Sequence, residues 1–297
     1  MVRPTPKLIE SAGLWPLRVL WLVLPLLAGP GFSAMLDGRS SAVATVSETG
    51  LWSMWFAGFV ALLAPSTVSL TVLRFVAPSL AASALYGTIA LGDWNTSTIG
   101  AIGATVVSFI AVMLPTTGDP MVNGSSYGPE RRLALRPPAA LIFGPMQLTW
   151  LVMFGATAAG MLFIAAERPL VGAPLLLLGL AACWRGGRSL HQLSRRWIVF
   201  VPAGFVIHDY WSLAETLLIQ RRDIASLGPA PLDKGELLDL SGGAMGLALL
   251  VETKDKVPLA LRAAKSVETF SAYRIVFTPT LPGRLLHEAR VRGITIG

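Results

Sequence analysis

The chain is short of charge and almost without cysteine. Only 14% of its 297 residues are Asp, Glu, Lys or Arg, whereas a typical soluble domain has about 25%. Hydrophobic residues make up 53% of the chain, and the mean hydropathy is +0.62. These values exclude an ordinary soluble globule and predict a polytopic membrane protein. The single cysteine, Cys183, excludes an intramolecular disulfide and a zinc site built on cysteines.

The chain also lacks the usual signatures of catalysis. It has no HExxH, no Walker A loop and no GxSxG element. The three histidines, His191, His208 and His287, fall in separate contexts. His208 precedes Asp209, but adjacent residues of a strand point to opposite faces of a sheet. We therefore expect no catalytic residue, no metal site and no cofactor, and a protein that is not an enzyme.

Positive charge is unevenly distributed along the chain. Residues 1–197 hold 13 Lys/Arg and 7 Asp/Glu, whereas residues 198–297 hold 11 and 10. The excess lies at the ends of hydrophobic segments, so it does not indicate nucleic-acid binding. Arg18 and Arg74 are expected at span ends, which leaves no ionisable residue in the middle of a span. This expected absence counts against an ion-coupled transporter.

Six hydrophobic runs predict transmembrane helices. The expected spans are residues 17–36, 51–73, 75–91, 98–115, 139–165 and 170–184. The third and fourth are short, which leaves a partly re-entrant hairpin open. The first run resembles a signal peptide in part, but bulky Phe32 near the cleavage position favours its retention. Residues 1–184 are thus the expected transmembrane domain.

Basic residues beside these spans predict the orientation. Eleven Lys/Arg fall on one side, in the N-terminal segment, at Arg74, in the 116–138 loop and after residue 184. The other side has only Arg39 and Arg168. The positive-inside rule assigns the first set to the cytoplasm. We expect an inner-membrane protein with both termini in the cytoplasm.

The sequence pattern changes after Trp197. Short β-rich runs alternate with turn residues, and residues 197–208 predict a hairpin. About seven strands are expected before a final helix in the last 15 residues. Residues 185–197 form a basic juxtamembrane linker. Residues 198–297 form a small cytoplasmic, mainly β domain closed by a C-terminal helix.

Two stretches carry a resemblance to known proteins. RWIVFVPAGFVIHD and ETLLIQRRDIASLG, followed by the closing helix, resemble a bacterial pleckstrin-homology-like domain. This resemblance covers about the last third of the chain and implies a small barrel with a C-terminal helix. The order of NGSSYGPERRLALRPP, spans and this domain also resembles uncharacterised actinobacterial multispanning membrane proteins. That second resemblance implies no activity.

The loop between the fourth and fifth spans supplies one candidate site. Its candidate residues are Asp119, Asn123, Glu130, Arg131 and Arg132. Acid, amide and guanidinium groups at a membrane surface suit a phosphorylated lipid headgroup. The same composition is also typical of a solvated cytoplasmic loop, and both interpretations remain open.

Arginines near the membrane supply a second candidate site. The set is Arg185, Arg188, Arg195, Arg196, Arg221 and Arg222. A basic side chain near an anionic leaflet gains about 1 kcal/mol. We expect contact with anionic lipids of the cytoplasmic leaflet, with orientation and anchoring as the simpler interpretation.

Two functions fit these features. The first is a non-enzymatic scaffold or adaptor whose cytoplasmic domain docks a protein partner or anionic lipid. A homodimer through small-residue faces, such as that of Gly155 and Gly160, is also open. The alternative is a cell-envelope lipid or precursor transporter, or a membrane-bound enzyme, that uses the 119–132 loop.

Overall fold

The computed structural model describes residues 12–231, 237–262 and 267–297. The chain divides into two compact units. Among the described residues, the membrane unit consists of residues 12–121 and Gln147–Leu190. The β unit consists of Val122–Met146 and His191–Gly297, with the gaps given above. Each unit is built from two separate stretches of chain.

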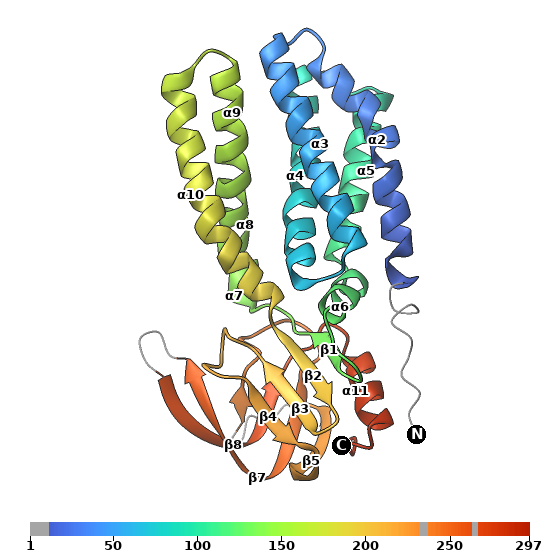
Figure 1. Cartoon of the computed structure of the whole chain (residues 1–297), viewed down its shortest axis with the longest axis vertical. Coiled ribbons are helices and arrows are strands. Elements are labelled where there is room, and N and C mark those ends of the chain that lie inside the picture. The colour runs from blue at the N-terminus through green and yellow to red at the C-terminus, as the bar shows by residue number, and fades with distance from the viewer. Residues whose placement is uncertain (1–11, 232–236, 263–266) are drawn as a thin grey trace. The chain divides into compact units, whose positions relative to one another are not determined.

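Within the described residues, six helices are long and apolar enough to cross a membrane. They are α2 (Trp15–Leu36), α3 (Ser41–Leu63), α4 (Thr67–Leu91), α5 (Thr96–Met113), a composite span (Ala139–Ala165) and α10 (Pro169–Ser194). The composite span contains α7 (Ala139–Ile142), α8 (Pro145–Leu151), the π-helical η2 (Val152–Ala156) and α9 (Thr157–Ala165). The short η1 (Ala12–Leu14) precedes α2, and α6 (Pro115–Asn123) follows α5. Figure 1 shows α2 to α5 as long neighbouring ribbons, with α9 and α10 as an antiparallel hairpin.

The boundaries expected for the second span, residues 51–73, are wrong. α3 ends at Leu63 and α4 begins at Thr67. The break contains Pro65, and the Ser66 hydroxyl accepts the Ser69 N–H at 3.0 Å, which caps α4. Ser40 caps α3 in the same way, so its first turns are helical despite their polar sequence.

As a consequence of these boundaries, α3 and α4 each contain a charged residue inside the span. Glu48 is the eighth residue of α3 and Arg74 the eighth of α4. In α3 and α4, any stretch of 18 residues, about the length that crosses a membrane, includes the charged residue of that helix. The expectation that Arg74 ends a span, and that spans lack internal charge, is therefore wrong.

Reciprocal indole hydrogen bonds join α2 to α3. Trp21 Nε1 donates to the Trp55 carbonyl, and Trp55 Nε1 donates to the Trp21 carbonyl, both at 2.8 Å. Pro25 has no N–H to offer the Trp21 carbonyl four residues earlier, so the Trp55 indole satisfies that acceptor. Gly58 lets the helices approach, because a Cβ there would collide with the Trp21 ring.

Glycines at intervals of seven residues bring α10 against the composite span. A Cβ at Gly172 would lie 2.7 Å from the Gly160 carbonyl, and one at Gly179 would lie 2.5 Å from the Thr157 nitrogen. A Cβ at Gly186 would lie 2.7 Å from Met153 Sδ. The seven-residue spacing keeps all three on one face of the helix. Small residues at such a face permit close helix approach in lipid.

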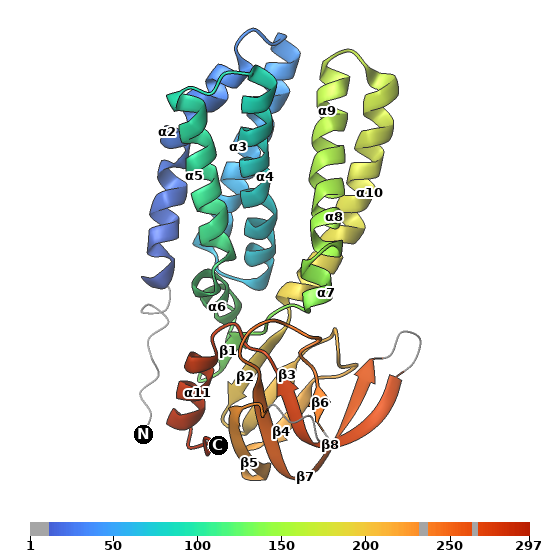
Figure 2. The same cartoon turned by 180° about the vertical axis from the view of Figure 1, so that it is seen from behind.

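The β unit contains two four-stranded sheets and one helix. The first sheet has the order β1 (Arg131–Ala134), β2 (Trp197–Val201), β3 (Gly204–His208), β4 (Leu217–Gln220). The second has the order β5 (Ile224–Pro229), β7 (Leu249–Arg262), β8 (Val267–Phe277), β6 (Leu238–Asp239). The helix α11 (Pro282–Val291) follows the strands (Figure 2). Six apolar helices followed by a mainly β region and a closing helix confirm the expected fold class.

Strand β1 does not belong to the expected C-terminal segment. It comes from the loop between the fourth and fifth spans and pairs antiparallel with β2, with Leu133 opposite Ile198. The chain then continues along the unit, since Arg136 N–H donates to the Thr278 carbonyl and Thr280 N–H to that of Ala134. The β unit is therefore larger than the expected 198–297 domain. The part of the 119–132 loop from Val122 onward belongs to this unit.

The core of the β unit lies among the two sheets and α11. Phe200, Phe205 and Phe277 are fully buried and contact one another through their rings. Leu285 and Ala289 fix the inner face of α11. The long strand β7 has a register shift between Glu252 and Val257, so it bends while it stays paired with β8 on both sides of the shift.

Candidate functional site

A buried ion pair lies in the interior of the β unit. Arg196 Nε and Nη2 donate to the two carboxylate oxygens of Asp209 at 2.8 and 2.7 Å. The guanidinium also donates to the carbonyls of Arg136 and Leu240, so one side chain joins three segments. Both side chains are at most 1% exposed. Arg196 therefore cannot reach a lipid headgroup and leaves the candidate lipid-contact set, and Asp209 is unavailable as a partner for His208.

A ladder of stacked rings and guanidinium groups crosses β1, β2 and β3. The Trp197 and His208 rings stack with centroids 4.3 Å apart, and the Tyr210 ring meets His208 edge-on. Arg132 covers the Trp197 ring, and Arg195 covers the Tyr210 ring. We call these five residues the aromatic ladder.

Burial within the aromatic ladder lowers the pKa of His208 below its ordinary value. The positive charges of Arg195 and Arg132 lower the pKa further, while a hydrogen bond to the Arg195 carbonyl opposes the shift. The neutral imidazole is therefore the favoured form. The ring is held by stacking on Trp197 and by its hydrogen bond with the Arg195 carbonyl.

The candidate residues of the 119–132 loop have structural contacts. Asn123 Oδ1 accepts the Arg132 N–H at 3.0 Å, and Glu130 lies 3.4 Å from the Arg132 guanidinium. Arg131 is 9% exposed, and this burial is the main cause that lowers its pKa to about 10. Asp119 is fully buried and belongs to the membrane unit. The set is therefore divided between two units and is largely enclosed.

The remaining candidate arginines are also divided between the units. Arg185 and Arg188 lie in α10, where the Arg188 guanidinium covers the Trp184 ring at 4.0 Å. Arg221 and Arg222 form the start of η3 (Arg221–Asp223) and are exposed. Arg222 lies 3.6 Å from Asp223. Their common contact with lipid stays a prediction.

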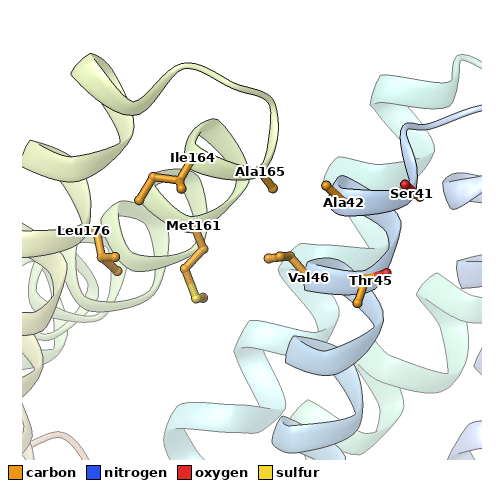
Figure 3. Close-up of a pocket in the computed structure, with 8 residues that line it drawn as sticks. All are labelled: Ser41, Ala42, Thr45, Val46, Met161, Ile164, Ala165 and Leu176. Atoms are coloured by element: carbon orange, nitrogen blue, oxygen red, sulfur yellow. The ribbon is translucent and has the colours of Figure 1, made fainter.

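A wide pocket opens between α3 and the α9–α10 hairpin. Figure 3 shows Ala42 and Val46 of α3 across the pocket from Met161 and Ile164 of α9. Its volume is about 530 Å³, and its lining is apolar except for two hydroxyls. No charged group lines it, so it offers hydrocarbon contacts without a means of selecting a headgroup.

A second, smaller cavity lies among α2, α3, α4 and α5 and has a volume of about 210 Å³. Its lining is mostly aliphatic and aromatic, and Glu48 is the one charged residue in it. A charged group beside an apolar cavity can fix the orientation of a ligand. The sequence pattern suggested a polar loop at Glu48. One sequence signal did indicate a helix here: Ser40 is a typical N-cap residue, and the residues after it tolerate a helix.

The outer half of the β7–β8 hairpin presents an unpaired strand edge. In the part of the chain that the structure describes, β6 pairs with β8 at Ile275 and Val276 alone. Among the described residues, no strand pairs with the outer side of 267–272. Val267 and Phe270 on this segment are 61% and 49% exposed.

Backbone hydrogen bonds determine which groups face that edge. Ala214 N–H donates to the Ala260 carbonyl, and Arg262 N–H donates to the Ser212 carbonyl. The backbone N–H and C=O groups of Ala260 and Arg262 therefore point away from β8. Their partners in β8, Thr269 and Val267, consequently lie in non-hydrogen-bonded pairs. By the same alternation, the N–H and C=O groups of Val267, Thr269 and Ser271 face outward.

The described residues contain no group of three or more His, Cys, Asp or Glu side chains that could hold a metal ion. Cys183 faces the composite span, where its Sγ lies 3.6 Å from the Met153 carbonyl. Neither finding supplies a reactive centre.

Comparisons with family models, with curated proteins and with solved structures found no match for this chain. The resemblance to pleckstrin-homology-like domains and to actinobacterial proteins therefore has no support from them. By length and composition of its helices, the chain is a multi-pass membrane protein.

Proposed function

We propose that this protein is a non-enzymatic membrane scaffold whose β unit docks an extended segment of a partner protein. The observation that carries the proposal is the outward-facing edge of β8 at Val267, Thr269 and Ser271. Unpaired N–H and C=O groups along an exposed strand are a template for an added strand. Main-chain hydrogen bonds supply affinity in such complexes, and side-chain pockets supply specificity.

Side chains around this edge suit a peptide ligand. Phe270 and Val267 offer apolar contact, and Glu268 adds one charge. A groove lined by Glu215, Thr216, Leu217, Pro258, Leu259, Ala260 and Thr269 lies beside the hairpin, with a volume of about 220 Å³. Alternate side chains of an added strand point to opposite faces of the sheet, so those on one face can use this groove.

The proposed orientation places the β unit in the cytoplasm. The pairing of β1 with β2 supports a common side for the 131–134 segment and the C-terminal part, because strands in one sheet must lie on the same side of a membrane. The composite span and α10 connect β1 to β2 and return the chain to its starting side. The excess of arginine beside these spans then assigns that side to the cytoplasm.

Strand addition is tested by removing one outward N–H. Thr269→Pro deletes that donor without removing a hydrogen bond to β7, and proline is tolerated at a sheet edge. Thr269→Val keeps the backbone and is the matched control. Full-length variants are purified from native membranes in mild detergent, and bound proteins are quantified. We expect a stoichiometric partner to be retained with wild type and valine, and to fall at least about tenfold with proline.

Equal recovery of the partner with all three proteins would refute strand addition at this edge. Recovery of a second copy of the same chain, detected by size and lost with proline alone, would replace the partner protein with a homodimer. Anionic lipid as the docked ligand predicts instead that Arg221→Ala with Arg222→Ala releases co-purified lipid while Thr269→Pro does not.

The alternative of an envelope-lipid transporter or enzyme that uses the 119–132 loop takes second place. Asn123, Glu130, Arg131 and Arg132 have contacts within the β unit that explain their positions. Arg131→Ala is expected to destabilise the β unit rather than to remove an activity selectively.

A further inference from the structure

The smaller cavity of the membrane unit lies beside two helices that are joined by hydrogen bonds. Leu24, Ala28 and Phe32 of α2 and Trp55 of α3 line it. The reciprocal hydrogen bonds between Trp21 and Trp55 fix the two helices beside it. Its volume of about 210 Å³ lies below the range of about 300–1,000 Å³ typical of drug-sized ligands. The space therefore suits a single hydrocarbon chain.

One charged side chain, Glu48, lines this cavity. It is exposed, and it makes no ion pair or hydrogen bond with any residue that the structure describes. A charged group within a membrane span is costly and calls for a partner. Nearby Trp52 is 57% exposed and also lines the cavity. An indole face attracts a cation.

We propose that the cavity binds a single-chain amphiphilic amine, with its alkyl chain among α2, α3, α4 and α5. The ammonium group pairs with the Glu48 carboxylate beside the Trp52 ring. Charge complementarity selects the cation, and the apolar lining selects the chain. This site is independent of the proposed docking edge, because it lies in the other unit.

The chemistry of the lining disfavours a bare metal cation. Ca²⁺ takes six to eight oxygen ligands and Mg²⁺ requires six in octahedral geometry. Glu48 is the one carboxylate in the lining, and the Thr105 hydroxyl already donates to the Ala101 carbonyl at 2.7 Å. An ammonium group requires fewer partners, and its chain fills the rest of the space.

Binding is measured on the full-length protein in a detergent with a rigid steroidal body, which does not imitate a single alkyl chain. Radiolabelled dodecylamine is the probe in a scintillation proximity assay. We expect saturable binding that unlabelled dodecylamine displaces at least about tenfold better than dodecanol or dodecyl sulfate. Equal displacement by dodecyl sulfate would overturn the proposal without any variant.

Two substitutions separate the charge from the cavity. Glu48→Gln should weaken dodecylamine binding at least about tenfold and leave competition by dodecanol unchanged. Gly29→Leu should remove binding of both compounds, because a Cβ at this cavity-lining position meets nothing within 4 Å and the side chain can fill the space. Glu167→Gln, in the α9–α10 turn, is the matched control and should bind as wild type.

Unchanged dodecylamine affinity in Glu48→Gln would exclude Glu48 as the counter-ion. Full binding by Gly29→Leu would exclude this cavity. Displacement by a short-chain phosphatidylethanolamine as effective as that by dodecylamine would contradict the single-chain assignment and point to an aminophospholipid.

Discussion

The two units hold their charged side chains in different ways. In the β unit, Arg196 is paired with Asp209, and Arg292 with Glu288. In the membrane unit, Arg18 donates to the carbonyl of Leu62, and Arg39 to that of Ala90. Leu62 and Ala90 are next to last in α3 and α4, where carbonyls have no intrahelical donor. These arginines thus pair with opposite charge in the β unit and with helix-terminal carbonyls in the membrane unit.

This difference predicts which kind of substitution destabilises each unit. The Arg196–Asp209 pair joins separate chain segments of the β unit, so loss of one charge leaves the other buried. Close backbone approach at glycine joins the helices of the membrane unit, so added volume is the damaging change there. The following substitutions test that division.

The largest effect is expected at the buried ion pair. Arg196→Met leaves the Asp209 carboxylate enclosed without its partner, and breaking such a pair costs about 3–5 kcal/mol. Asp223→Asn removes one member of the exposed pair with Arg222 and should cost less than about 1 kcal/mol. Protease resistance and thermal unfolding of the full-length variants measure the difference.

The double variant Arg196→Met with Asp209→Leu sharpens this prediction. Removing both charges abolishes the unpaired group, so the double variant should be more stable than Arg196→Met alone. If Arg196→Met unfolds at the same temperature as Asp223→Asn, the buried pair does not have the role assigned to it.

A smaller effect is expected from one methyl group between helices. Gly179→Ala would place a Cβ 2.5 Å from the backbone nitrogen of Thr157 and 2.8 Å from the Cα of Thr157. These are backbone atoms, so a change of side-chain rotamer cannot relieve the clash. Overpacking of this kind costs about 1–3 kcal/mol. Gly103→Ala makes the same substitution within α5, where a Cβ meets nothing within 4 Å.

Gly103→Ala should be neutral or slightly stabilising, since alanine favours a helix over glycine by about 1 kcal/mol. Thermal unfolding in detergent, followed by loss of the monodisperse gel-filtration peak, compares the two variants. Equal melting of Gly103→Ala and Gly179→Ala would contradict close packing of α10 on the composite span.

Hydropathy was sufficient to find six spans and insufficient to place their ends. The run 51–73 is apolar on average and has no charged residue, so hydropathy concealed the break at Pro65-Ser66. The readable capping signal was Ser66 itself, which follows Pro65 and directly precedes the helical run that begins at Thr67. Glu48 was assigned to a loop because its neighbours are polar. Composition outweighed the helix-start signal at Ser40.

Strand periodicity found the C-terminal strands because their partners are nearby in sequence. It did not find β1, whose partner β2 lies beyond two spans, since pairing between distant segments leaves no local pattern. The Arg196–Asp209 pair was hidden for a related reason. Four nearby arginines look alike in a basic junction, and only burial distinguishes Arg196 from Arg195.

The smallest effect concerns His208 in the aromatic ladder. Its pKa is lowered in the folded protein, so the unfolded chain binds a proton more readily. Stability should therefore fall as the pH drops below about 6.5, the ordinary pKa of histidine. His208→Gln removes this group, and its melting temperature should decrease less between pH 7.5 and 5.5 than that of wild type. His287→Gln, at an exposed position of α11, should retain the wild-type decrease. An identical decrease in His208→Gln and wild type would show that burial within the ladder does not disfavour the imidazolium ion.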